Sequence, residues 1–269
     1  MPIAESDGAR LRYEVAGPDG APALLLINSL GCALEMWDPQ LGDFSASFRV
    51  IRYDARGHGQ STLGNHSQLQ IADLARDAVA VLDAAGVKRA HWCGLSLGGM
   101  TSMWAAVHHP QRVATLVLSN TSAFLPPREN WDSRIETALN RSMGALVDTI
   151  LGRWFTEEFR HRHPAAIEPI RAMLLATSAA GYAACCAAIR DMDQRESLGA
   201  IRVPALVIAG ARDPATPPEH GEQIQQRIAG ARLTVLDAAH LSNVECAPEF
   251  TAAVLGFLSD PRPEEAVSA

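Results

Sequence analysis

Residues 90–99, Ala-His-Trp-Cys-Gly-Leu-Ser-Leu-Gly-Gly, decide the fold. The run Ala90–Cys93 has the length of a buried strand, and Gly98–His109 has a helical pattern that Pro110 ends. Between them the chain reads G-x-S-x-G, which holds a serine on a strained strand-to-helix turn where side chains two residues away would clash. A phosphate-binding loop fits less well, because no Lys-Ser or Lys-Thr pair follows. The pattern therefore predicts that Ser96 is an exposed nucleophile at the top of a sheet.

Apolar runs alternate with helical patterns along most of the chain. Further strands are predicted at Ala23–Asn28, Arg49–Asp54, Val113–Ser119, Ala205–Ala209 and Leu233–Leu236. Helices are predicted at Gln68–Ala85 and Pro248–Leu258. Strands that alternate with helices form a parallel sheet covered on both faces, and right-handed crossovers make it doubly wound.

One long segment interrupts this alternation. Residues 120–197 are helical in pattern and contain no clear strand. We therefore expect a core of residues 1–119 and 198–260, a helical cap inserted at 120–197, and a disordered tail at 261–269. The cap has nine arginines and ten acidic residues, a net charge of -1, so the rest of the chain carries -6 of the total -7.

A nucleophilic serine needs a base and an acid that orients the base. Asp213 follows the strand at 205–209, and His240 follows the strand at 233–236. The carboxyl ends of parallel strands meet at one edge of the sheet, where ligands bind. The order Ser96, Asp213, His240 predicts a catalytic triad in which His240 takes the serine proton and Asp213 fixes the histidine tautomer. The alternative is that Asp213 is a turn residue and His240 a surface imidazole.

An oxyanion hole needs two backbone donors. The N–H of Leu97 directly follows the nucleophile, and the second donor should come from the loop after the first core strand. That loop reads Ile-Asn-Ser-Leu-Gly over residues 27–31, so Leu30 is the expected donor and Ser29 the second choice. A plain glycine turn is the alternative.

Bulk properties exclude several classes of protein. The net charge of -7 without a basic block argues against a nucleic-acid partner. No apolar run approaches the roughly 18–20 residues of a membrane span, and Met1–Glu5 has no signal-peptide character. The five cysteines show no metal-ligand spacing, which favours reduced thiols in the cytoplasm.

The sequence resembles the α/β-hydrolase family along nearly its whole length, and within it the 3-oxoadipate enol-lactonase branch. The similar segments are residues 28–31 (Asn-Ser-Leu-Gly), 93–100 around the serine, 153–156, 211–217 and 240–245. Most members of the larger family have His-Gly where this chain has Asn28-Ser29. The resemblance implies an α/β-hydrolase fold, with a mostly parallel eight-stranded sheet, helices on both faces and a helical cap.

The resemblance also implies that an acyl-enzyme on Ser96 opens 3-oxoadipate enol-lactone to 3-oxoadipate, an aromatic-catabolism reaction of the β-ketoadipate pathway, with no cofactor and no metal. A general carboxylesterase or a carbon–carbon bond hydrolase with the same triad stays open. A perhydrolase and a slow-turnover ligand receptor are more distant alternatives. Haloalkane dehalogenases and epoxide hydrolases have aspartate at the position of Ser96.

The expected partner is a small anionic lactone, which an acidic protein must recognise locally. Trp131 and Arg134 lie three residues apart on a predicted helix, so both can face one cavity. Arginine can bind a carboxylate with two parallel hydrogen bonds, and a similar Trp-x-x-Arg occurs in relatives. Trp154 is a second candidate for an aromatic wall against the lactone ring, and Ser29 is a further candidate for substrate binding. The alternative is a solvated arginine beside core tryptophans, and the sequence leaves a homo-oligomer open.

Overall fold

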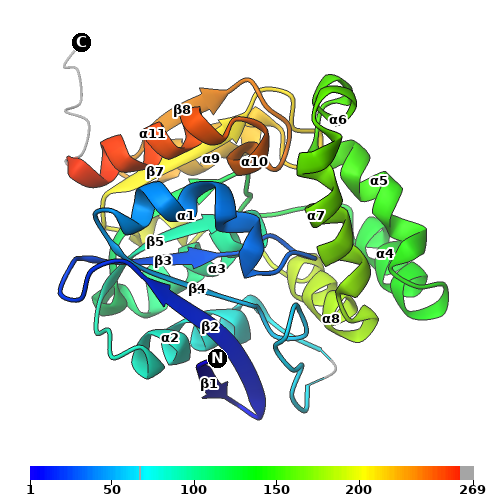
Figure 1. The fold of residues 1–269 in the computed structure, drawn as a ribbon, viewed down its shortest axis with the longest axis horizontal. Helices are drawn as coiled ribbons and strands as arrows, with labels where there is room; N and C mark the ends of the chain where they lie inside the picture. The colour runs from blue at the N-terminus through cyan, green and yellow to red at the C-terminus, as the bar shows by residue number, and fades with distance from the viewer. Residues whose placement is uncertain (67, 261–269) are drawn as a thin grey trace.

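A computed structural model describes residues 1–66 and 68–260 (Figure 1). Its centre is an eight-stranded sheet in the order β1-β2-β4-β3-β5-β6-β7-β8. The strands are β1 (Ile3–Ser6), β2 (Ala9–Ala16), β3 (Ala23–Ile27), β4 (Arg49–Tyr53), β5 (Ala90–Leu95), β6 (Val113–Ser119), β7 (Ala205–Gly210) and β8 (Arg232–Leu236). From β4 to β8 all neighbouring strands are parallel, whereas the β1–β2 and β2–β4 pairs are antiparallel. The tail expected at 261–269 lies outside the described residues.

The central strands are apolar throughout because helices cover both of their faces. Leu24, Leu25 and Leu26 of β3 are fully buried, although their side chains alternate between the two faces. On one face α1 (Asp38–Ser45) packs against α11 (Ala247–Ser259); on the other lie α2 (Ile71–Ala84), α3 (Leu97–His108) and α9 (Pro218–Arg227). The predicted doubly wound α/β sheet is confirmed.

The antiparallel edge of the sheet was not among the predicted strands. β1 and β2 form a hairpin whose turn contains Asp7 and Gly8, both with positive φ (46° and 76°). An Asp-Gly pair is a strong hairpin signal. The strands themselves carry charged residues at alternate positions, so they lack the continuous apolar run that marks the central strands.

Between β6 and β7 the chain is mostly helical, with one isolated antiparallel bridge between Phe124 and Asp193. Its α-helices are α4 (Arg128–Asn140), α5 (Gly144–Trp154), α6 (Glu157–Arg162), α7 (Pro164–Ala176) and α8 (Ala179–Arg190). These helices gather beside the carboxyl ends of the parallel strands, at the right of Figure 1. We call residues 120–197 the cap; that the cap is a separate domain stays a prediction. Among the described helices, no single one is long and apolar enough to cross a membrane, and only α7 and α8, bent by 94°, meet those limits together.

The Asp54–Gly59 turn joins the cap to the core. A Cβ atom on Gly57 would lie 2.4 Å from Cα of Gly181 in α8, so the two backbones touch. Arg56 is buried and paired with Asp77 of α2. His58 is also buried, and burial lowers its pKa to about 4. These contacts give the turn a structural role.

Candidate active site

Ser96 occupies a strained turn between β5 and α3. Its φ is 56° and its ψ -112°, a conformation that residues other than glycine rarely adopt. A Cβ atom on Gly94 would lie 2.2 Å from the carbonyl oxygen of Gly98, and one on Gly98 would lie 2.1 Å from that of Ile27. The expectation that glycine is needed on both sides of the serine is therefore confirmed.

Asp213 and His240 meet in the loops after β7 and β8. Asp213 Oδ2 lies 2.7 Å from His240 Nδ1, and both residues are only 3% exposed. Asp213 Oδ1 accepts hydrogen bonds from the N–H groups of Ala215 (2.7 Å) and Thr216 (3.0 Å). Burial alone would raise the pKa of Asp213, but His240 and the hydrogen bonds from Asn120 and Thr216 lower it to about 2. The carboxylate is therefore charged and fixed behind the imidazole.

Asn120 completes this arrangement, and the sequence analysis missed it. It follows β6 with a φ of 44°. Its Nδ2 donates to Asp213 Oδ2 (3.0 Å) and to the carbonyl oxygen of Ala239 (3.2 Å), while Ser242 donates to its Oδ1 (2.5 Å). One side chain thus ties the acid to the loop that carries His240. Its signal was an asparagine at a strand end, which is too common to stand out.

A cavity of about 350 Å³ lies between the strand ends and the cap. It brings together most of the predicted site residues, namely Ser29, Leu30, Ser96, Trp131, Arg134, Trp154 and His240. Asp213 stands behind His240, and Leu97 begins α3 beside Ser96. No hydrogen bond joins Ser96 to His240 among the described residues, and such bonds commonly tighten only when substrate is bound.

Two backbone donors are free at the positions expected for an oxyanion hole. Among the described residues, neither the Leu30 nor the Leu97 N–H donates to a protein acceptor. The Ser29 N–H instead donates to Sδ of Met36 (3.3 Å). Of the two candidates in this loop, only Leu30 therefore keeps its donor available.

The loop that carries Leu30 is anchored from its first residue. Asn28 Nδ2 donates to the carbonyl oxygen of Tyr53 (2.9 Å), and Trp37 Nε1 donates to Asn28 Oδ1 (2.9 Å). Asn28, which stands where most of the larger family has histidine, thus joins β4 to the short helix η1 (Leu34–Trp37).

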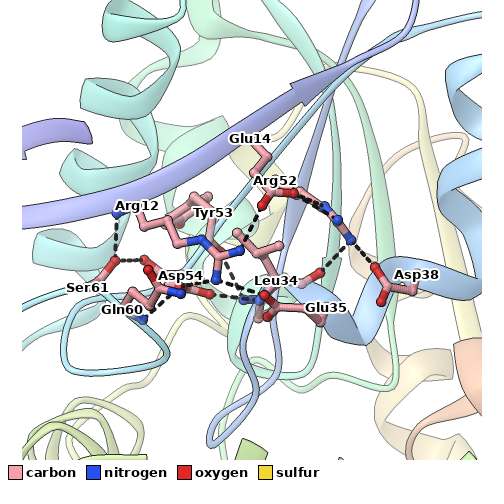
Figure 2. Close-up of polar contacts among 11 residues, drawn as sticks. Arg12, Glu14, Leu34, Glu35, Asp38, Arg52, Tyr53, Asp54, Gln60 and Ser61 are labelled. Carbon is pink, nitrogen blue, oxygen red and sulfur yellow. Dashed lines mark hydrogen bonds and ion pairs between the residues drawn. The ribbon is translucent and has the colours of Figure 1, made fainter. Parts of the chain in front are cut away.

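A buried ion network holds η1 in turn, as Figure 2 shows. Asp54 Oδ1 accepts the N–H of Leu34 (2.8 Å), and Arg12 lies between Asp54 (3.5 Å) and Glu35 (2.7 Å). Arg52 donates to the carbonyl oxygen of Leu34 (3.2 Å). Burial raises the pKa of Asp54, although the backbone donors and Arg12 oppose that shift. The network therefore holds the first two residues of η1, Leu34 and Glu35, a few residues after Leu30.

The cap supplies the opposite wall of the cavity. Cζ of Arg134 lies 4.9 Å from the centre of the Trp131 ring and 5.7 Å from that of Tyr182, so aromatic rings hold the guanidinium. The ring of Trp154 stacks on His240 with centres 6.4 Å apart. Arg153 also lines the cavity and was not among the predicted site residues.

The cap is fastened to the loop that carries His240. Leu241, next to His240, donates its N–H to the carbonyl oxygen of Trp154 (3.0 Å). Glu245 accepts the N–H groups of Ala239 (2.9 Å) and of Thr156 (3.2 Å), so one carboxylate bridges the His240 loop and the start of α6. Among the described residues, no group of three or more His, Cys, Asp or Glu side chains is arranged to hold a metal ion.

The chain belongs to the α/β-hydrolase fold family, whose model matches residues 22–246. Within that family it is 36% identical to 3-oxoadipate enol-lactonase 1 of Acinetobacter baylyi, over 95% of this chain and 96% of that protein. It is 38% identical to 3-oxoadipate enol-lactonase 2 of the same species, over 91% of each. The crystal structure of the enol-lactonase from Burkholderia xenovorans LB400 superposes with a TM-score of 0.94 at 41% identity, covering 96% of this chain and 100% of that one.

Proposed function

We propose that this protein is a serine esterase that opens 3-oxoadipate enol-lactone to 3-oxoadipate, in the β-ketoadipate pathway of aromatic catabolism. The observation that carries the proposal is the likeness to two enol-lactonases over at least 91% of the chain. The composition of the cavity supports it, because arginine and tryptophan side chains from the cap face Ser96 and His240.

The first half of the reaction forms an acyl-enzyme. His240 takes the proton of Ser96, whose oxygen attacks the lactone carbonyl. The N–H groups of Leu30 and Leu97 stabilise the oxyanion. Asp213, held charged by its hydrogen bonds, keeps the imidazole oriented and stabilises the imidazolium. Collapse of the tetrahedral intermediate breaks the ring ester bond and leaves 3-oxoadipate attached to the serine.

The leaving group requires little help from a general acid. It is an enolate, a weaker base than an alkoxide, so the ring can open before proton transfer from His240 is complete. The enolate then takes up the proton that His240 received from Ser96 and becomes the keto form, which leaves His240 neutral. In the second half His240 activates a water, which attacks the acyl-enzyme and releases the free acid. Neither half needs a metal or an organic cofactor.

The cap residues account for recognition of an anionic lactone. Arg134 binds the substrate carboxylate, and Trp131 and Trp154 pack against the flat ring, with Ser29 on the opposite side of the cavity. The cap of residues 120–197 covers the site as a lid domain. Free cysteine thiols support a cytoplasmic location.

The test follows the ultraviolet absorbance of the enol-lactone on addition of purified protein. We expect rapid loss of absorbance over many turnovers, and much slower hydrolysis of simple alkyl esters and of diketones. A preference for simple esters would indicate a general carboxylesterase, and cleavage of the diketones a carbon–carbon bond hydrolase. A single turnover followed by arrest would indicate a ligand receptor.

A further inference from the structure

The catalytic cavity is basic although the protein is acidic. Arg134 and Arg153 line it, and none of its lining residues is an aspartate or glutamate. The whole chain carries a net charge of -7. Two guanidinium groups without an acid in the same walls create a local positive potential that favours anions.

The two cavity arginines differ from most arginines of the cap. Five of the nine form ion pairs with acidic residues, namely Arg128, Arg162, Arg171, Arg190 and Arg195. Arg134, Arg141, Arg153 and Arg160 have no acidic partner in the part of the chain that the structure describes. Both arginines that line the cavity therefore belong to the unpaired minority.

A second cavity adjoins the first one. It has a volume of about 240 Å³ and lies between α4 and α5; we call it the α4–α5 groove. Its lining residues are Asn130, Ser133, Arg134, Thr137, Leu146, Thr149, Ile150 and Arg153. Four of these, Asn130, Arg134, Ile150 and Arg153, also line the catalytic cavity. No acidic residue lines the groove either, so the basic surface runs from the catalytic cavity into it.

The two arginines are held differently at this junction. Arg134 is packed over Trp131 and Tyr182, which fixes its guanidinium near the catalytic cavity. Arg153 is exposed and makes no hydrogen bond or ion pair with a described residue. Its neighbour Trp154 stacks on His240, so the backbone of Arg153 is placed by the same contact that covers the catalytic histidine.

We propose that the α4–α5 groove is a second carboxylate subsite, in which Arg153 binds the distal carboxylate of acyl compounds too long for Arg134. The ligand class is the half-esters of straight-chain dicarboxylic acids. The inference rests on the proposed function in using Ser96 as the nucleophile and Arg134 as the group that binds a nearer carboxylate. With a monomethyl half-ester, each turnover adds one water across the acyl–oxygen ester bond and releases methanol, a dicarboxylate and a proton.

The test measures kcat/KM for monomethyl esters from succinate to suberate, with methyl esters of unbranched monocarboxylic acids of equal length as neutral controls. The variants are Arg153→Met, Arg153→Lys and Arg134→Met. Arg141→Met is the matched control, since Arg141 is an exposed, unpaired cap arginine that lines neither cavity. The melting temperature of each variant shows whether it is folded.

We expect Arg153→Met to lower kcat/KM about 10-fold for the longest half-esters and to leave the short half-esters and the neutral esters unchanged. Arg134→Met should instead lower kcat/KM for the short half-esters and have the smallest effect on the longest ones. Arg153→Lys should keep most of the activity, and the Arg153→Met effect should shrink as salt rises, because the group is exposed.

Two results would overturn the subsite: Arg153→Met matching Arg141→Met across the series, or Arg153→Met lowering charged and neutral esters equally. The enol-lactone assay of the unmodified protein separates the two proposals. If the protein opens no enol-lactone but shows the chain-length dependence, the proposed function fails and the subsite stands. If it opens the enol-lactone and Arg153→Met matches Arg141→Met, the subsite alone fails.

Discussion

Ser96 shows how much of the chemistry follows from one backbone conformation. The positive φ of 56° and the 2.1–2.2 Å approaches at its flanking glycines leave no room for larger residues around the turn. The main chain of the serine is also held, since its carbonyl oxygen accepts a hydrogen bond from the Thr121 hydroxyl (2.7 Å). These constraints act on the main chain, so they do not depend on the serine hydroxyl.

Replacing Ser96 with alanine should therefore remove turnover and leave the fold intact. Loss of a triad nucleophile lowers the rate by on the order of 10⁴–10⁶, or roughly 5–8 kcal/mol of barrier. Steady-state rates on the enol-lactone, with circular dichroism as the check on folding, measure both effects. A folded variant that keeps more than a few per cent of the activity would show that Ser96 is not the nucleophile.

Asp213→Asn should cost about 10⁴-fold in kcat, because an amide favours the wrong histidine tautomer. The pKa of Asp213 is lowered to about 2, so the carboxylate contributes stability above the ordinary aspartate pKa of about 3.9 and loses it as pH falls through about 2. Asp213 should therefore set no limb of the rate profile above about pH 4.

A double-mutant cycle with His240→Ala checks this assignment. The two losses should be far from additive, since the triad acts as a unit. Clean additivity would place Asp213 outside it.

The meeting of Ser96, Asp213 and His240 at one cavity could be predicted from the sequence, because each residue has a positional signature at the end of a strand. Their roles as a catalytic triad stay a prediction. The role of Asn120 could not be predicted, since it depends on three groups from two separate segments meeting at one side chain. Arg153 was missed for a similar reason. It begins residues 153–156, a segment similar to the enol-lactonase branch. Only the packing of α5 against α4, however, shows that its side chain lines the cavity.

At the scale of elements, the sequence was most informative where strands are buried on both faces. β3, β5 and β7 appear as continuous apolar runs, and their predicted positions agree with the structure to within two residues. β1, β2 and α1 were not predicted. The hairpin alternates charged and apolar residues, and α1 is short and polar for a helix, so neither has a strong apolar pattern.

The Glu245 carboxylate connects two elements, the start of α6 in the cap and the loop that carries His240. Glu245→Ala leaves the N–H groups of Ala239 and Thr156 without their acceptor. An unsatisfied, partly buried donor costs about 1–3 kcal/mol, so we expect a measurable fall in the free energy of unfolding and a lower kcat with little change in KM. Urea denaturation and steady-state kinetics measure these quantities.

Glu249→Ala is the matched control for the bridge. Glu249 is an exposed acid in the first turn of α11, and removing it should cost no more than about 1 kcal/mol. Equal effects of the two substitutions on kcat would show that Glu245 does not position the His240 loop. A restored kcat in Glu245→Gln would indicate that the acceptor oxygen matters more than the charge.

At the scale of the whole molecule, the charge of the cavity has the opposite sign to the net charge of the protein. The protein carries -7, yet the cavity walls hold two arginines and no acid. Long-range attraction therefore cannot bring in an anionic lactone, and recognition depends on the few groups inside the cavity. Trp131 and Arg134 were predicted to share a helix face toward one cavity, and both line it.

Arg134→Met tests whether that arginine binds the substrate carboxylate. Methionine keeps an unbranched apolar stem against Trp131 and Tyr182, so the loss is mainly that of the guanidinium. A charge-assisted hydrogen-bonded pair is worth about 1.5–3 kcal/mol, which corresponds to about 10–150-fold in kcat/KM. We expect this loss on the enol-lactone and almost none on a neutral lactone of similar size. Arg141→Met removes the same charge from the cap surface and should change neither rate. Equal losses on both lactones would mean that Arg134 supports the packing of the cap and does not bind the substrate carboxylate.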